Sequence, residues 1–226
     1  MATEQQNAFV LHTRPYQENK LLVELLTEFD GKIAAVTYAT QSKINNKKAL
    51  LQPFTPLIIE FSGRSNLKKL HQVEAAGKSS MLSGTPLYCG FYMNELLVRL
   101  LPEHIPCDSL YQHYVKALIS ITDNRPLEAI LRRFELTLLD ELGLALDFTP
   151  AFTSQSSHLS FSSEHGFIEP IEGLQQYFRP HLQAIAEQEL ISADVLATCK
   201  LLMRNILNQL LGHRPLNSRK LFEKRE

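Results

Sequence analysis

Hydrophobic and polar positions follow two different periods along the chain, and the change falls near residue 80. Before it, short segments rich in β-branched, apolar and aromatic residues alternate with small turns, a pattern that predicts β-strands. Beyond it, apolar residues recur at three- and four-residue steps, which is the spacing of one helix face. The pattern therefore predicts two domains, 1–80 and 81–226.

The first domain is expected to contain five strands, at residues 8–13, 20–28, 32–39, 51–61 and 67–75. Asp30–Gly31 between two apolar runs indicates a hairpin. Segment 20–28 could be a short helix by periodicity, but its position before this turn favours a strand. Two prolines place the first half of 51–61 at an edge or bend. Five short strands suit a small closed barrel such as an OB-fold, with an SH3-like barrel as the alternative.

The second domain is expected to be all-helical, with helices at residues 85–101, 108–122, 126–143, 174–188 and 192–212. A short irregular insert at about 146–172 interrupts them and contains a small hairpin or ordered loop at 157–170. Pro126 suits the first turn of the central helix, and Gly143 suits the left-handed position beyond its end. The basic tail from residue 213 is expected to be partly mobile. The predicted fold class is therefore α+β.

The central helix has a wider apolar stripe than a surface helix needs, so we expect other elements to cover it on more than one side. The stripe consists of Leu127, Ile130, Leu131, Phe134, Leu138 and Leu142, with Leu136 and Leu139 as a second edge. Arg132 and Arg133 interrupt this stripe. They are either paired structurally, for example by an i,i+4 ion pair from Glu128 to Arg132, or held for an anionic partner.

Composition adds little to the choice of function. The chain is 44% hydrophobic and 21% charged, as in an ordinary globular protein. Its net charge of −1 conceals a basic front half, because residues 1–80 hold ten Lys/Arg against seven Asp/Glu. That excess fits nucleic-acid binding and an ordinary solvated surface equally well. We expect a cytoplasmic protein, because there is no secretory signal or membrane-spanning run and the three cysteines are widely separated.

Motifs for catalysis are missing from the sequence. It contains no GxxxxGK[ST], GxGxxG, HExxH or CxxC, and residues 63–67 do not form a GxSxG nucleophile elbow. His158 and His165 share the irregular insert, but two histidines without a nearby cysteine make a weak zinc site. We therefore expect a binding protein without metal or cofactor rather than an enzyme, with an unrecognised nuclease as a remote alternative.

Basic residues around the predicted barrel and near the C-terminus suggest a track for a phosphate backbone. The candidate DNA-binding residues are Lys20, Lys32, Lys43, Lys47, Lys48, Arg64, Lys68, Lys69, Arg214, Arg219 and Lys220. Because side chains alternate along a strand, at most one of Lys68 and Lys69 is expected to line a given groove. The candidates for stacking on bases are Tyr16, Tyr38, Phe54 and Phe61, although most of these are expected in the core.

Five stretches of the chain, in this order, resemble the RecO family of bacterial recombination mediators, in its proteobacterial branch. They are AFVLHTRPYQENKLL at 8–22, KKALLQPFTPLIIEF at 47–61, LYCGFYMNELLVRLL at 87–101, LRRFELTLLDELG at 131–143 and RPLNSRKLFE at 214–223. The resemblance implies an OB-fold followed by a helical domain. Many members carry a four-cysteine zinc module at about 148–170, but this chain has no cysteine between Cys107 and Cys199, so we do not expect zinc.

The resemblance implies that the protein binds single- and double-stranded DNA and anneals complementary strands, including strands coated by single-strand-binding protein (SSB). It also implies cooperation with RecR, so that RecA replaces SSB during gap repair, and a nucleoid-associated location in the cytoplasm. Annealing needs no bond-making chemistry, because it requires only that phosphates on two strands be neutralised. The alternative is a protein-interaction adaptor that docks SSB and RecR and contacts DNA only incidentally.

Family members also dock the acidic, Phe-ending tail of SSB on the helical domain. Such a ligand needs an apolar pocket for the phenyl ring and a cation for the terminal carboxylate. The candidate residues here are Arg132, Arg133, Leu136 and Leu139, of which Arg132 is favoured for the cation. The sequence does not indicate the RecR-binding surface or the oligomeric state.

Overall fold

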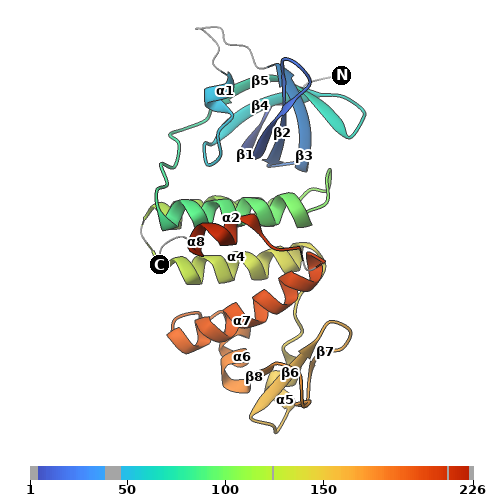
Figure 1. The fold of residues 1–226 in the computed structure, drawn as a ribbon, viewed down its shortest axis with the longest axis vertical. Helices are drawn as coiled ribbons and strands as arrows, with labels where there is room; N and C mark the ends of the chain where they lie inside the picture. The colour runs from blue at the N-terminus through green and yellow to red at the C-terminus, as the bar shows by residue number, and fades with distance from the viewer. Residues whose placement is uncertain (1–4, 39–46, 124, 213, 224–226) are drawn as a thin grey trace. The chain divides into compact units, whose positions relative to one another are not determined.

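The computed structural model in Figure 1 describes residues 5–38, 47–123, 125–212 and 214–223. The chain forms two compact units, Met1–Asp123 with Leu216–Glu226, and Asn124–Pro215. The first unit therefore contains the predicted barrel, the helices α2 (Thr85–Leu100) and α3 (Asp108–Thr122), and the C-terminal segment. Packing divides the chain at a different place from the change of sequence period near residue 80.

The first unit contains a closed barrel in the order β1-β2-β3-β5-β4. Its strands are β1 (Gln5–Tyr16), β2 (Lys20–Thr27), β3 (Gly31–Tyr38), β4 (Leu57–Ser62) and β5 (Leu67–Ala75), with the short helix α1 (Lys47–Leu50) between β3 and β4. Neighbouring strands are antiparallel except β3 and β5, which are parallel and share three residue pairs. This OB-like barrel confirms the prediction.

Sequence patterns of neighbouring residues predicted the positions of most strands. β5 coincides with its predicted segment, and Gly31 has a φ of +65° in the hairpin between β2 and β3. A Cβ at Gly31 would lie 1.9 Å from the carbonyl oxygen of Ile105, so only glycine fits there. The predicted fourth strand was too long, because β4 begins at Leu57 and the proline-containing residues before it form turns.

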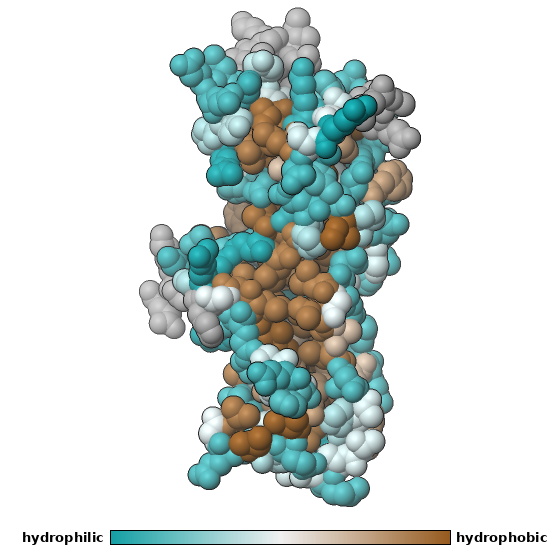
Figure 2. All heavy atoms as spheres, turned by 90° about the vertical axis from the view of Figure 1, so that its right-hand side faces the viewer, coloured by the Kyte–Doolittle hydropathy of each residue, from teal (hydrophilic) through white to brown (hydrophobic). Residues whose placement is uncertain are grey.

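Apolar side chains from all five strands form the barrel core, and Leu51 joins them from the segment before β4. The buried members from the strands are Ala8, Val10, Leu21, Val23, Leu25, Ile33, Ala35, Leu57, Ile59, Leu70 and Val73. The surface of this unit in Figure 2 is mostly hydrophilic, with a smaller apolar area among polar side chains. This distribution fits the two-residue alternation of strands that have one face in a core.

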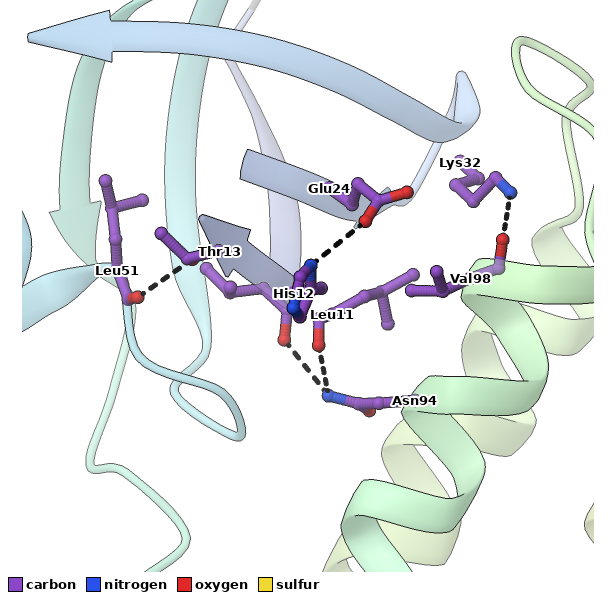
Figure 3. Close-up of polar contacts among 9 residues, drawn as sticks. Leu11, His12, Thr13, Glu24, Lys32, Leu51, Asn94 and Val98 are labelled. Atoms are coloured by element: carbon purple, nitrogen blue, oxygen red, sulfur yellow. Dashed lines mark hydrogen bonds and ion pairs between the residues drawn. The ribbon is translucent and has the colours of Figure 1, made fainter. Parts of the chain in front are cut away.

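A buried polar network joins β1 to the helices α2 and α3, and Figure 3 shows the part of it between β1 and Asn94. The pairing of β1 with β2 shifts register between Val10 and His12. The Nδ2 of Asn94 on α2 donates to the carbonyl oxygens of Val10 and Leu11, at 3.3 and 3.0 Å. The hydroxyl of Tyr114 on α3 donates to Asn94 Oδ1 at 2.7 Å. Asn94 therefore supplies donors to strand carbonyls at the register shift.

The C-terminal segment, η1 (Asn217–Arg219) followed by α8 (Lys220–Glu223), packs on α2, where Phe222 contacts Tyr88 and the carboxylate of Glu95 binds the start of η1. Glu95 accepts the backbone N–H groups of Asn217 and Ser218, each at 2.8 Å, and the Ser218 hydroxyl at 2.6 Å. Glu95 thereby satisfies donors that the start of a helix leaves without partners. Leu216 and Ser218 are buried, so the expectation of a partly mobile tail was wrong for this segment.

The second unit combines helices with a small sheet in the order β7-β6-β8. Its elements are α4 (Leu127–Glu141), α5 (Thr149–Thr153), β6 (His158–Ser162), β7 (Gly166–Ile168), β8 (Gln176–Phe178), α6 (Arg179–Ala186) and α7 (Ala193–Leu210). The hairpin of β6 and β7 confirms the predicted one at 157–170. The predicted helix 174–188 was wrong in its first part, because β8 pairs with β6 there. The region is largely helical rather than all-helical.

The central helix α4 ends as its sequence predicts. Gly143 has a φ of +71°, its N–H donates to Asp140, and the N–H of Leu144 reaches back to the carbonyl of Leu139 at 2.8 Å. Pro126 precedes the helix as its N-cap residue, one position earlier than expected. Most of the predicted stripe is buried, while Leu127 and Leu142 are half-buried.

Substitution of Asn94 by leucine should destabilise the first unit strongly. The variant leaves two strand carbonyls and the Tyr114 hydroxyl without this partner, at a cost of about 1–3 kcal/mol for each buried group. We expect the free energy of unfolding in urea to fall by about 3 kcal/mol or more. Tyr114→Phe removes a single hydrogen bond and should cost about 1 kcal/mol. An equal, small loss in both variants would contradict the proposed role of Asn94.

The Glu95 cap should make the C-terminal segment sensitive to acid. Burial alone would raise the pKa of Glu95, but hydrogen bonds from Ser218 and Asn217 and the charge of Arg99 lower it overall. Because the folded-state pKa lies below the unfolded one, the cap stabilises fully above the ordinary glutamate pKa. That stability is lost as the pH falls through the folded pKa. The protection of residues 217–219 against hydrogen exchange, relative to the intrinsic exchange rate at each pH, should therefore fall on acidification.

The variant Glu95→Gln should show this low protection already at neutral pH, because its amide nitrogen cannot accept an N–H, and the protection should no longer depend on acid. Glu74→Gln, an exposed carboxylate on β5, is the matched control and should behave as the parent. Unchanged exchange in Glu95→Gln would show that other contacts hold the segment.

Candidate functional site

A cleft of about 390 Å³ opens at one end of the barrel. Its lining residues are Tyr16, Gln17, Lys20, Val36, Thr37, Tyr38, Leu67, Lys68, Lys69 and Leu70. Three consecutive residues of β3 and four of β5 take part, so the cleft crosses the strands where these two run parallel. Lys68 and Lys69 consequently both line it, contrary to the expectation from strand alternation. The lining residues in the described part of the chain include three lysines and no carboxylate.

An exposed aromatic ring lies among these cations. Tyr38 is the last residue of β3, faces Lys20 in the β2–β3 ladder, and is 55% exposed. The Nζ of Lys20 lies 5.5 Å from the ring centroid and also donates to Gln17 Oε1 at 2.9 Å. Lys68 Nζ donates to the carbonyl of Gly63 at 3.2 Å. Ammonium groups beside an exposed ring are the combination that binds single-stranded nucleic acid.

The other predicted stacking residues have different surroundings. Phe54 is 4% exposed and packs against Phe91, with ring centroids 5.5 Å apart. Phe61 is partly buried against the barrel core. Tyr16 lines the cleft but is half-buried. Of the four aromatic candidates, Tyr38 therefore presents the most open ring to the cleft.

Lys32 is buried and contributes to the packing of the barrel on α2 rather than to the cleft. It is 6% exposed, and its Nζ donates to the carbonyl of Val98 in the last turn of α2 at 2.8 Å (Figure 3). Burial lowers the pKa of Lys32, while Glu24 and Glu103 act in the opposite direction. A cation at the carbonyl end of a helix stabilises that end. We therefore leave Lys32 out of the proposed DNA interface.

The remaining basic candidates are not brought together in this cleft. Arg64 is exposed in the turn between β4 and β5. Lys43 lies outside the described residues, as do the side chains of Lys47 and Lys48 at the start of α1. Arg214 belongs to the second unit, whereas the last two candidates, Arg219 and Lys220, lie on the C-terminal segment that Glu95 holds. The structure thus groups Lys20, Lys68 and Lys69.

The second unit contains a pocket of about 170 Å³, lined by both apolar and polar residues. Its lining residues are Leu136, Leu139, Asp140, Leu146, Phe148, Ile185, Ala186 and Gln188. Leu136 and Leu139 therefore share one pocket. Because a cavity of about 150 Å³ accommodates benzene, this pocket is large enough for a phenyl ring. The carboxylate of Asp140 in the lining disfavours an anionic group next to it.

Arg132 lies in the buried part of α4 rather than among the described residues that line this pocket. It is 7% exposed, and its Nη1 lies 2.8 Å from Oε2 of the fully buried Glu135. Its Nε has no hydrogen-bond partner within the described residues. Glu128 pairs instead with Lys200 at 3.2 Å, so the suggested Glu128–Arg132 pair was wrong. Arg133 is exposed.

Sequence reasoning missed two carboxylates that matter. Glu135 stands three residues after Arg132, and this i,i+3 spacing was a usable signal. Glu95 accepts hydrogen bonds from residues more than 120 positions away, and no local sequence pattern predicts such a contact.

The described residues offer neither a metal site nor a membrane-spanning helix. They contain no group of three or more His, Cys, Asp or Glu side chains that could hold a metal ion. No helix in the described ranges has the length and apolar character needed to cross a membrane. Cys89, Cys107 and Cys199 are buried thiols.

Comparisons with known proteins identify the family. Residues 1–78 match the profile of the recombination protein O N-terminal region, and residues 81–220 match that of the C-terminal region. The DNA repair protein RecO of Stutzerimonas stutzeri is 41% identical, over 98% of this chain and 94% of the relative. RecO of Enterobacter sp. is 40% identical over 96% and 95%, and RecO of Alteromonas mediterranea is 36% identical over 98% of both chains. The chain belongs to the RecO family of DNA repair and recombination proteins.

Proposed function

We propose that this protein is a non-enzymatic, DNA-binding recombination mediator. In this proposal it anneals complementary strands and, together with RecR, helps RecA replace SSB on single-stranded DNA in gap repair. The observation that carries the proposal is the cleft at the barrel end, which Lys20, Lys68, Lys69 and the exposed Tyr38 line together. The relatives' name, DNA repair protein RecO, supports the same role.

The cleft supports annealing through charge. Two complementary strands repel each other through their phosphates, and each phosphate neutralised by a lysine releases condensed counterions. Three lysines in one cleft reduce the charge of a bound strand over a few nucleotides. Base pairing with a second strand then proceeds against less repulsion. The protein needs no nucleotide or metal for this step, because base pairing itself supplies the free energy.

Docking of the SSB tail is the second part of the proposal. The pocket beside Leu136 and Leu139 is large enough for a terminal phenyl ring. The Nε of Arg132, which lacks a hydrogen-bond partner within the described residues, keeps a donor for a carboxylate, and Arg133 adds an exposed cation. Binding requires Arg132 to turn away from Glu135 at least partly, because the two are now paired.

The alternative function is an adaptor that brings SSB and RecR together and contacts DNA only incidentally. The pocket of the second unit favours this reading, because its residues are distinct from those of the basic cleft. The two functions differ in one assay. A mediator accelerates the pairing of naked complementary strands, whereas an adaptor leaves that rate unchanged.

The triple variant Lys20→Gln, Lys68→Gln, Lys69→Gln should bind single-stranded DNA more weakly at every sequence. Loss of up to three phosphate contacts should reduce the salt slope of log K by about 2, at about 0.7 per contact. Fluorescence anisotropy over a salt series measures this slope. The control triple Lys78→Gln, Lys116→Gln, Lys200→Gln changes net charge equally at exposed positions elsewhere. Equal slopes in both triples would remove the cleft from the DNA site.

Arg132 should contribute to binding of the SSB tail. Removing it alone takes the ion-pair partner from the buried Glu135, so the test uses Arg132→Met with Glu135→Met, which removes both charges together. A peptide with an acidic sequence ending in phenylalanine should bind this variant about tenfold more weakly, as expected from the loss of one charged hydrogen bond. Annealing of naked strands should be unchanged.

The matched control for this variant is Glu128→Gln with Lys200→Gln, which removes an exposed ion pair on the same unit. It should bind the peptide as the parent does. Equal peptide affinity in the Arg132–Glu135 variant and the parent would refute the assignment of Arg132.

A further inference from the structure

Tyr38 has unusual surroundings for a tyrosine of this protein. Tyr92, Tyr111, Tyr114 and Tyr177 are at most 5% exposed, whereas Tyr38 is 55% exposed at the edge of the basic cleft. A single exposed aromatic residue is ordinary on a protein surface. Tyr38 differs because three lysines line the same cleft, so a polyanion held by them passes close to the ring.

Lys20 and Tyr38 face each other across the first residue pair of the β2–β3 ladder. The Lys20 ammonium now lies over the ring, 5.5 Å from its centroid. A cation over an aromatic ring at an exposed site is a weak contact, and a phosphate is a stronger partner for an ammonium group. A bound strand can therefore draw the ammonium to a phosphate and leave that face of the ring open to a base.

Lysines and the ring should respond differently to the two forms of DNA. Ammonium groups bind the phosphates of single strands and duplexes alike. An aromatic ring needs the open face of a base, which a single strand offers. In a duplex each base is stacked between its neighbours, and exposing its face requires unstacking.

We infer that Tyr38 stacks on an unpaired base, and that the cleft thereby holds single strands by a contact that duplex formation removes. The inference rests on the proposed DNA-binding function and deepens it. Such stacking would make the cleft's contacts with a strand differ before and after pairing. A strand is held by phosphates and by a base before pairing, and by phosphates alone afterwards, so pairing removes one of the contacts that keep the strand in the cleft.

The chain contains no tryptophan, which makes a direct test simple. In Tyr38→Trp the indole at the cleft is the sole tryptophan, and stacking on a base should quench its emission. A saturating single-stranded oligonucleotide of mixed sequence should quench it clearly, and a duplex of the same length should not. Phe29→Trp is the control, because Phe29 is 57% exposed at the other end of the β2–β3 hairpin. Its emission should change with neither DNA.

Affinity measurements provide a second readout. Tyr38→Ala should weaken binding of the single-stranded oligonucleotide by about 5- to 100-fold, which is the range reported by alanine substitution at stacking positions. Duplex affinity should stay within about twofold of the parent, since the lysines remain. Tyr38→Phe, which keeps the ring, should bind both DNAs as the parent does.

Three results would overturn the inference: quenching of Tyr38→Trp by neither DNA, equal quenching by both, or equal loss of affinity for both in Tyr38→Ala. The lysine triple variant separates this failure from failure of the proposed function. If the salt dependence of log K becomes weaker in the lysine triple variant while the Tyr38 variants behave as the parent, the cleft binds DNA without stacking. If the triple keeps its slope, the DNA site lies elsewhere.

Discussion

The architecture of the first unit depends on how the protein satisfies two backbone carbonyls of β1. A closed barrel pairs most of its backbone between strands, but the register shift near Val10 directs two carbonyl oxygens to α2. Asn94 meets both with one amide group, and Tyr114 on α3 satisfies the amide oxygen. Buried carbonyls require partners, so this network fixes two helices against one strand. It also places the neighbouring residue, Glu95, where the C-terminal segment is capped.

Charged groups in this protein divide into those that hold the structure and those that face solvent, and composition does not separate them. Lys32 and Arg132 both looked like ligands for anions in the sequence. The structure places Lys32 on a helix carbonyl and Arg132 beside a buried glutamate. Lys20, Lys68 and Lys69 instead line one cleft together with an exposed ring, that of Tyr38. Burial and partners, rather than charge alone, therefore distinguish the candidate interface.

Features that depend on neighbouring residues were predictable from the sequence. β5 and α3 coincide with their predicted segments, and Gly31 and Gly143 take the left-handed conformations that their turns require. Features that depend on distant pairing were not. β8 has three residues and becomes a strand only by pairing with β6. The cleft combines Lys68 with Lys69 because it crosses strand ends, so strand alternation gave the wrong rule for it.

The hydrogen bonds of Glu95 with Asn217 and Ser218 also affect the order in which the two units complete folding during synthesis. Glu95 on α2 is synthesised long before Asn217 and Ser218, which together donate three of the hydrogen bonds to its carboxylate. Residues 124–215 form the other unit in between. On the ribosome, Glu95 must therefore remain hydrated while the entire second unit is translated. The first unit to begin folding is consequently the last to be completed, because contacts that complete it come from residues 217 and 218.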